Sequence, residues 1–174
     1  MNTNTNIAKV MEKILLALTN MVILAPENLL MAVTNMTILA PIILAAISQD
    51  YWTLFVVGFV FAASVISHLV ENHKYGMPGF IKVSKEVSYY WNRVDVFGCG
   101  LVVTRFLYLY VKYGPPITKW DALLTGISLV LNVASGYDKS NGNLKWFPYL
   151  TLHSIWHIMA GYLMATFLQK IYYG

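Results

Sequence analysis

Apolar residues gather in long stretches along this chain, and short segments rich in polar residues, proline or glycine separate them. A helix that crosses a bilayer needs about 20 mostly apolar residues. Five stretches meet this length, and the fold class they predict is an all-α integral membrane helical bundle of five to six transmembrane helices, built as a single transmembrane domain over residues 1–174. The five predicted spans are 29–48, 52–71, 92–112, 118–136 and 148–169.

The stretch 7–25 leaves two interpretations open. It carries Lys9, Glu12 and Lys13 among apolar residues at helical spacing. It therefore predicts either a sixth transmembrane helix or an amphipathic helix that leads into the bundle.

A short repeat runs through the N-terminal region: LLALTNMVILAP at 15–26 is followed by LMAVTNMTILAP at 30–41. Two copies at this short offset do not make a solenoid, so we interpret the repeat as a local duplication. Each copy ends in a proline, and we expect Pro26 to separate two helices and Pro41 to kink one.

The composition agrees with a membrane setting. Hydrophobic residues make up 57% of the chain and charged residues 11%, against about 25% charged residues in an average soluble domain. The formal charge of +4 lies mostly in connecting segments, so we expect no nucleic-acid partner. The single cysteine, Cys99, excludes an intrachain disulfide and a Cys-rich zinc knuckle. The polar, uncharged start and the long apolar run after it do not predict a cleavable signal peptide.

Three of the four histidines lie within or at the ends of apolar stretches. His153 and His157 are one helical turn apart, so they share a helix face, and His68 lies near the end of the second predicted span. Imidazole is costly in hydrocarbon unless it is paired or bound to a metal. These three histidines therefore predict a buried metal site.

Alternation of the spans brings further polar residues to the same level. The second span ends on one side of the membrane, which we name side X, and the third and fifth spans begin there. This places Asp95 within the first turn or so of the third span and the histidine pair in the first turns of the fifth. Ser64 lies one turn before His68 on the same face. All five residues are predicted to form one layer near one membrane face.

The distribution of basic residues assigns that face. The loops on side X carry more Lys and Arg than those opposite, so the positive-inside rule predicts that side X is cytosolic, in a multi-pass protein of an internal membrane. If residues 7–25 form a transmembrane helix, the excess of basic residues on side X almost vanishes. The basic residues on side X are Lys74, Lys82, Lys85, Arg93, Lys139 and Lys145, and those opposite are Lys112, Lys119 and Lys170.

The predicted layer suits zinc chemistry. Catalytic Zn²⁺ takes three protein ligands and a water, whose pKa it lowers towards 7, and it polarises a carbonyl oxygen. Asp95 could take the proton from that water or orient it, and Ser64 could ligate weakly or hydrogen-bond the developing oxyanion. The alternatives are a packing or interfacial role for His68, a helix-capping role for Asp95 and simple helix packing for Ser64.

The order of these residues resembles the CREST superfamily of membrane proteins, which includes alkaline ceramidases and progestin and adipoQ receptors. The pattern is Ser64-x-x-x-His68, then Asp95, then His153-x-x-x-His157, and the resemblance covers residues 29–169. It implies zinc bound by the three histidines and hydrolysis of a membrane lipid amide or ester, as in a ceramidase.

The chain departs from that superfamily in length. One full span separates the Asp95 helix from the histidine-pair helix, where the superfamily's seven-span bundle has three. The loss of two spans keeps the parity of the topology. It removes part of the wall that would hold a lipid chain, and a homodimer could restore that wall.

Two hypotheses follow. The first is a zinc-dependent integral membrane hydrolase of a lipid amide or ester. The second is a non-enzymatic multi-pass membrane protein, receptor-like or structural, in which the metal site is structural or absent. An open coordination position and a lipid-sized cavity beside the metal would favour the first.

Three other polar residues near these spans have less specific roles. We expect Glu71 and His73 to lie at the interface in water, with Glu71 as a partner of His68 the alternative. Arg105 lies near the middle of the third span, where it is expected to pair with a polar group such as Asn132 or to snorkel.

Overall fold

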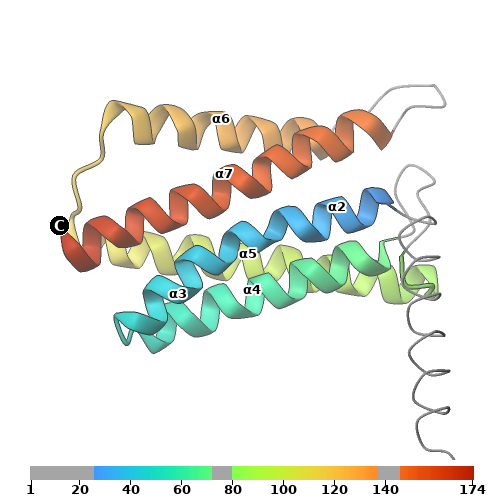
Figure 1. Cartoon of the computed structure of the whole chain (residues 1–174), viewed down its shortest axis with the longest axis horizontal. Coiled ribbons are helices and arrows are strands. Elements are labelled where there is room, and N and C mark those ends of the chain that lie inside the picture. The colour runs from blue at the N-terminus through green and yellow to red at the C-terminus, as the bar shows by residue number, and fades with distance from the viewer. Residues whose placement is uncertain (1–25, 72–79, 137–145) are drawn as a thin grey trace, which may run out of the picture.

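The computed structural model describes residues 26–71, 80–136 and 146–174, and every regular element in these segments is a helix. The predicted all-α class is therefore confirmed for this part of the chain, whereas the stretch 7–25 and His73 lie outside it. In chain order the elements are α2 (Pro26–Thr34), the 3-10 turn η1 (Asn35–Ile38), α3 (Leu39–Ile47), α4 (Tyr51–Val70), α5 (Lys85–Tyr113), α6 (Lys119–Gly136) and α7 (Trp146–Tyr173) (Figure 1).

Each of the five predicted spans corresponds to helical structure. Among the described residues, three helices are long and apolar enough to cross a membrane: Asn28–Ile47, Tyr51–Val70 and Lys85–Tyr113. The helices α6 and α7 are not among them, and both carry polar residues, such as Asn132 in α6 and the histidine pair in α7. The count of five spans therefore stays a prediction.

The helix ends follow local side-chain chemistry. The Asp50 carboxylate accepts a hydrogen bond from the Thr53 backbone N–H and caps α4. Ser84 caps α5 in the same way, and Gly114 ends α5 at a φ of 56°, which glycine adopts without strain. The third span was thus predicted to start too late. Asp95 lies almost three turns into α5, so it does not cap this helix.

The proline at position 41 interrupts the first described span, as expected. The segment runs as α2, the tighter turn η1 and then α3, with Pro41 in the first turn of α3. A proline ring clashes with the carbonyl four residues earlier and donates no hydrogen bond, and here that carbonyl belongs to Thr37 in η1. The repeat therefore contributes a broken helix, in which the 3-10 turn packs against α7.

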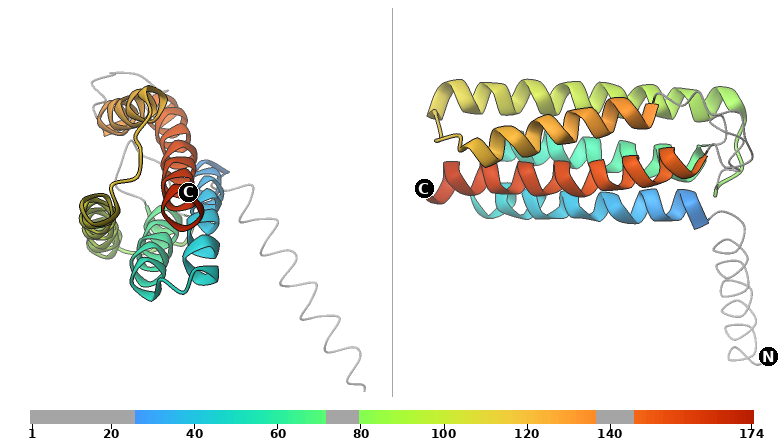
Figure 2. Two further views of the ribbon diagram at one scale, coloured as in Figure 1. Left: turned by 90° about the vertical axis from the view of Figure 1, so that its left-hand side faces the viewer. Right: turned by 90° about the horizontal axis from the view of Figure 1, so that it is seen from above.

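Seen end-on, the helices form an open arc (Figure 2). The helix α5 packs on α4, the segment α2–η1–α3 lies between α4 and α7, and α6 packs on α7. Close approach of η1 and α7 depends on Gly161, since a Cβ there would lie 2.5 Å from the Thr37 hydroxyl oxygen. The helices α5 and α6 form the two ends of the arc.

Ion pairs hold the end of the bundle where α4 begins and α7 ends. Arg105 donates to both carboxylate oxygens of Asp50 at 2.8 Å and to the Thr53 hydroxyl at 2.9 Å. Arg105 therefore pairs with polar groups, as one of the two alternatives expected, but its partners are Asp50 and Thr53 rather than Asn132. Burial raises the pKa of Asp50, but hydrogen bonds from Thr53, Tyr172 and Arg105 outweigh it and lower this pKa to about 2.

Candidate metal centre

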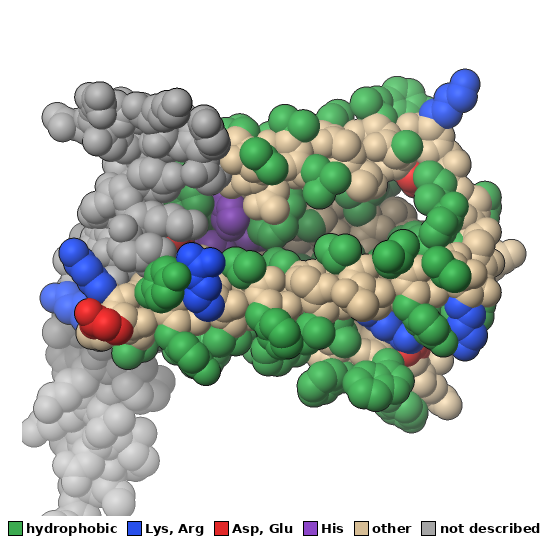
Figure 3. Space-filling view, turned by 180° about the vertical axis from the view of Figure 1, so that it is seen from behind, with side chains coloured by type: hydrophobic (Ala, Val, Ile, Leu, Met, Phe, Trp, Pro, Cys, Tyr) green, Lys and Arg blue, Asp and Glu red, His purple; other side chains and the backbone are tan. Residues whose placement is uncertain are grey.

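Three histidines from two helices converge at the other end of the bundle. His68 comes from the last turn of α4, and His153 and His157 come from α7. One nitrogen of each ring lies within 4.8 Å of the corresponding nitrogens of the other two. His68 and His157 are buried and His153 is half-buried. In the space-filling view the histidine side chains appear in a hollow between two ridges of the molecule (Figure 3). We refer to these three residues as the histidine centre.

Hydroxyl groups orient the two histidines of α7. The Thr34 hydroxyl donates to the Met31 carbonyl, and its oxygen lies 3.1 Å from Nδ1 of His157. Because the hydroxyl has only one proton, Nδ1 of His157 must be the donor in that contact. The Ser135 hydroxyl donates to the Asn132 carbonyl and lies 3.1 Å from Nδ1 of His153, so the same argument applies. In both rings the lone pair is on Nε2.

A carboxylate orients the third ring. Nδ1 of His68 lies 3.1 Å from Oε2 of Glu71, and the Tyr149 hydroxyl donates to both oxygens of this carboxylate at 2.9 and 3.0 Å. The side chain of Asn28 donates to the Glu71 backbone carbonyl at 2.8 Å. Glu71 is 1% exposed, so the expectation that it lies in water at the interface is wrong. Glu71 is the C-cap of α4 and lies three residues after His68.

In all three rings a neighbouring oxygen lies 3.1 Å from Nδ1. When Nδ1 donates its proton to that oxygen, Nε2 is the nitrogen that can bind a metal ion. Nε2 of His68 and Nε2 of His157 are only 3.3 Å apart, a distance at which a shared proton or a metal ion between them offsets the repulsion of two lone pairs. Three neutral imidazoles with oxygen partners on their outer nitrogens are the donor set of a transition-metal site. The residues present therefore fit a metal ion such as zinc.

The structure places Ser64 and Asp95 beside this centre. Both line the same cavity as His157, Ser64 from α4 and Asp95 from α5. Within the described residues, the group whose ligand atoms converge contains the three histidines and not Asp95. The predicted layer thus divides into a histidine set and a carboxylate and hydroxyl that face the adjoining space.

That adjoining space is a cavity of about 460 Å³ between the two ends of the arc. It extends from His157 to Lys170, a distance of about 20 Å along α7 at the rise of an α-helix, and its walls come mainly from α5, α6 and α7. Between these ends most of its lining is apolar, including Val60, Phe106 and Leu163. Figure 3 shows it as a hollow between the ridges, with histidine atoms at its wall.

Sequence reasoning missed most of the residues that orient the imidazoles. Tyr149 lies one turn before His153 and shares its face, so helical spacing alone could have found it. Thr34 and Ser135 contact the centre across helices, and no spacing along the chain indicates such a contact.

Comparison with known proteins gives one informative match. No family model and no solved structure matches the chain. The chain is 44% identical over 136 residues to "Uncharacterized protein L282" of Acanthamoeba polyphaga mimivirus, and the alignment covers 75% of this chain and 88% of that protein. This identity over most of both chains shows that the chain belongs to the same protein family as the mimivirus protein.

Proposed function

We propose that this protein is a zinc-dependent integral membrane hydrolase of a lipid amide or ester. One observation carries the proposal: three imidazole rings, each with one nitrogen within 4.8 Å of those of the other two, lie at the end of a long, mainly apolar cavity. The resemblance to the CREST superfamily supports it, as does the apolar composition of the helices. In this proposal α6 and α7 also cross the membrane, with the histidine centre near the cytosolic face.

Each residue beside the centre has a proposed role. His68, His153 and His157 hold the metal, which when bound lowers the pKa of water and polarises a carbonyl oxygen. Asp95 accepts the proton of the attacking water, and the Ser64 hydroxyl donates to the oxyanion that develops on the substrate. The acyl chain lies along the apolar part of the cavity and enters sideways, between α5 and α6.

The cavity supports the hydrolase over a protein with a purely structural metal. A structural zinc site is closed by four protein ligands and needs no space beside it. Here three histidines converge, and His157, Ser64 and Asp95 all line the adjoining cavity. One chain supplies all the residues that line this cavity in the structure. In a homodimer, a second copy would cover the open side between α5 and α6.

Purified protein in detergent, loaded with zinc, is expected to hydrolyse N-hexadecanoylsphingosine or a hexadecanoyl ester of glycerol. Asp95→Asn should retain stoichiometric zinc and lose about 10²–10⁴-fold in turnover, the usual contribution of a general base. Glu86→Gln is the matched control, because it is the same change at an exposed position of the same helix, and it should leave turnover unchanged. Full activity in Asp95→Asn, or no hydrolysis of either lipid by the zinc-loaded protein, would contradict the proposal.

A further inference from the structure

The helix α6 carries a stripe of polar residues along one face. Successive members are four, three, four and three residues apart, which is the spacing of one helix face. The opposite face of α6 is exposed and apolar, with Leu123 and Val130 among its residues. The polar stripe consists of Asp121, Thr125, Ser128, Asn132 and Ser135.

This stripe faces the cavity. Its first four members line the cavity wall, and the fifth, Ser135, contacts Nδ1 of His153. The opposing wall from α5 is apolar over the same length, with Val102, Val103 and Phe106 among its residues. The cavity therefore has a polar wall from α6 and an apolar wall from α5.

An acyl chain does not account for the polar wall. The Thr125 and Asn132 side chains are exposed within the structure, and no hydrogen bond of the Asn132 side chain occurs among the described residues. A polar group without a partner in hydrocarbon costs several kcal/mol. Polar residues in a membrane bundle accordingly face water-filled space or a substrate path.

The two ends of the stripe lie at different levels of the bundle. At one end Asp121 forms an ion pair with Lys170, and both line the cavity. At the other end Ser135 contacts the histidine centre. The fourteen residues between the ends correspond to about 21 Å of helix, most of the roughly 30 Å hydrocarbon thickness.

We propose that the polar stripe lines a water-filled passage from the membrane face at Lys170 to the histidine centre. Its use rests on the proposed function, because cleavage of an amide or ester adds the hydroxyl of water to the acyl carbon and its hydrogen to the leaving nitrogen or oxygen. The passage would bring this water from the membrane face opposite the one near the histidine centre. The acyl chain lies against α5, and water follows α6.

The test measures water access to α6 by cysteine labelling. Thr125→Cys and Asn132→Cys on the stripe are compared with Leu123→Cys and Val130→Cys on the outer face of the same helix. All four are made in a Cys99→Ser background, since Cys99 also lines the cavity. The protein is reconstituted into phosphatidylcholine vesicles and treated with a charged, membrane-impermeant methanethiosulfonate reagent.

Stripe positions are expected to react at least about tenfold faster than the outer positions, because a thiol in apolar surroundings rarely forms the reactive thiolate. Equal rates at the two faces, or no reaction on the stripe, would overturn the passage. Labelling needs neither zinc nor substrate, so this outcome would leave the hydrolase proposal intact, and absence of hydrolysis would leave the passage intact.

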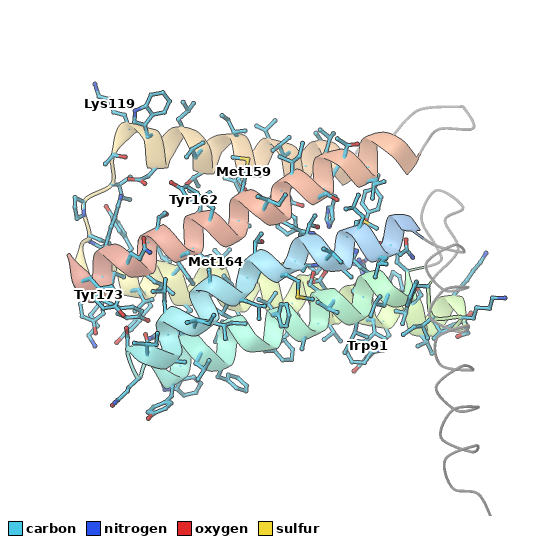
Figure 4. All side chains as sticks on the ribbon, viewed as in Figure 1. Trp91, Lys119, Met159, Tyr162, Met164 and Tyr173 are labelled. Carbon is cyan, nitrogen blue, oxygen red and sulfur yellow. The ribbon has the colours of Figure 1, made fainter. Side chains whose placement is uncertain are left out.

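A second measurement uses the unaltered protein, in case a cysteine variant fails to fold. Met159 and Met164 are both half-buried in α7 (Figure 4), but only Met164 lines the cavity. Hydroxyl radicals made from internal water in vesicles should oxidise Met164 several-fold faster than Met159. Equal oxidation of the two methionines would contradict a hydrated cavity.

Discussion

Polar side chains are arranged differently at the two ends of the bundle. At the ion-paired end, which consists of Asp50, Arg105, Asp121 and Lys170, each charge has a partner of opposite sign within the chain. At the histidine centre, the inner nitrogens of three imidazoles face one another. Their outer nitrogens lie 3.1 Å from oxygen atoms of Thr34, Ser135 and Glu71.

The comparison distinguishes polar residues that stabilise the fold from polar residues that could bind a metal ion. Asp50 and Arg105 satisfy each other and join α4 to α5, so nothing further is needed at that end. The three histidines of the centre could hold a metal ion. Changes at the two ends should therefore affect different measurements.

The largest expected difference concerns Glu71, which holds His68 from outside the centre. Glu71→Gln keeps the side-chain shape but weakens the acceptor for Nδ1 of His68, so zinc affinity should fall about 10–100-fold. Competition with a chelator of known affinity measures this. Asp121→Asn, the equivalent change at the ion-paired end, should leave zinc affinity unchanged, and a similar loss in both variants would remove the distinction between the ends.

Removal of a charge at the ion-paired end should reduce stability without affecting the metal. Arg105→Met leaves Asp50 without its cationic partner, and the loss of charged hydrogen bonds should cost about 2 kcal/mol of unfolding free energy. Denaturant unfolding in detergent measures the cost, and zinc content should stay stoichiometric. Loss of zinc together with stability would mean that the two ends are not independent.

Acid should weaken the ion-paired end in a predictable range. The pKa of Asp50 in the folded protein is about 2, below its ordinary value of about 3.9, so its stabilising contribution is present above pH 4 and is lost as the pH falls from about 4 to 2. Unfolding followed between pH 6 and pH 2 should therefore show a stability loss that is smaller in Asp50→Asn. An identical acid dependence in both proteins would show that Asp50 gains nothing from these contacts.

The smallest effect is expected at Thr34. Thr34→Val keeps the volume but removes the acceptor for Nδ1 of His157, and a neutral hydrogen bond of about 1 kcal/mol corresponds to about a fivefold loss of zinc affinity. Thr104→Val is the control, since the Thr104 hydroxyl donates to the Gly100 carbonyl of its own helix. An unchanged affinity in Thr34→Val would show that this hydroxyl does not orient the ring.

Much of the architecture could be predicted from the apolar stretches, because a helix that crosses a bilayer needs about 20 mostly apolar residues. The start of α5 was predicted too late because the segment from Lys85 to Trp91 is polar and aromatic, and its helicity depends on the Ser84 cap rather than on hydropathy. Helix alternation correctly brought His68 close to His153 and His157.

The partners of the histidines were harder to predict, since they depend on how helices pack. Glu71 is three residues from His68, yet a carboxylate beside a helix end is usually solvated. Its burial depends on contacts across helices, which include Tyr149 of α7 and Asn28 of α2. The three- and four-residue spacing of the polar stripe of α6 can be recognised in the sequence. Which space the stripe faces is known only from the structure, where the arc is open between α5 and α6 and leaves a cavity.

The zinc content of the purified protein tests the central claim most directly. Elemental analysis of the detergent-purified protein should give about one zinc per chain, and the double variant His153→Ala, His157→Ala should give none while its helical circular dichroism is retained. A wild-type protein that holds no stoichiometric metal after zinc loading, or a double variant that binds as much as the wild type, would contradict the account.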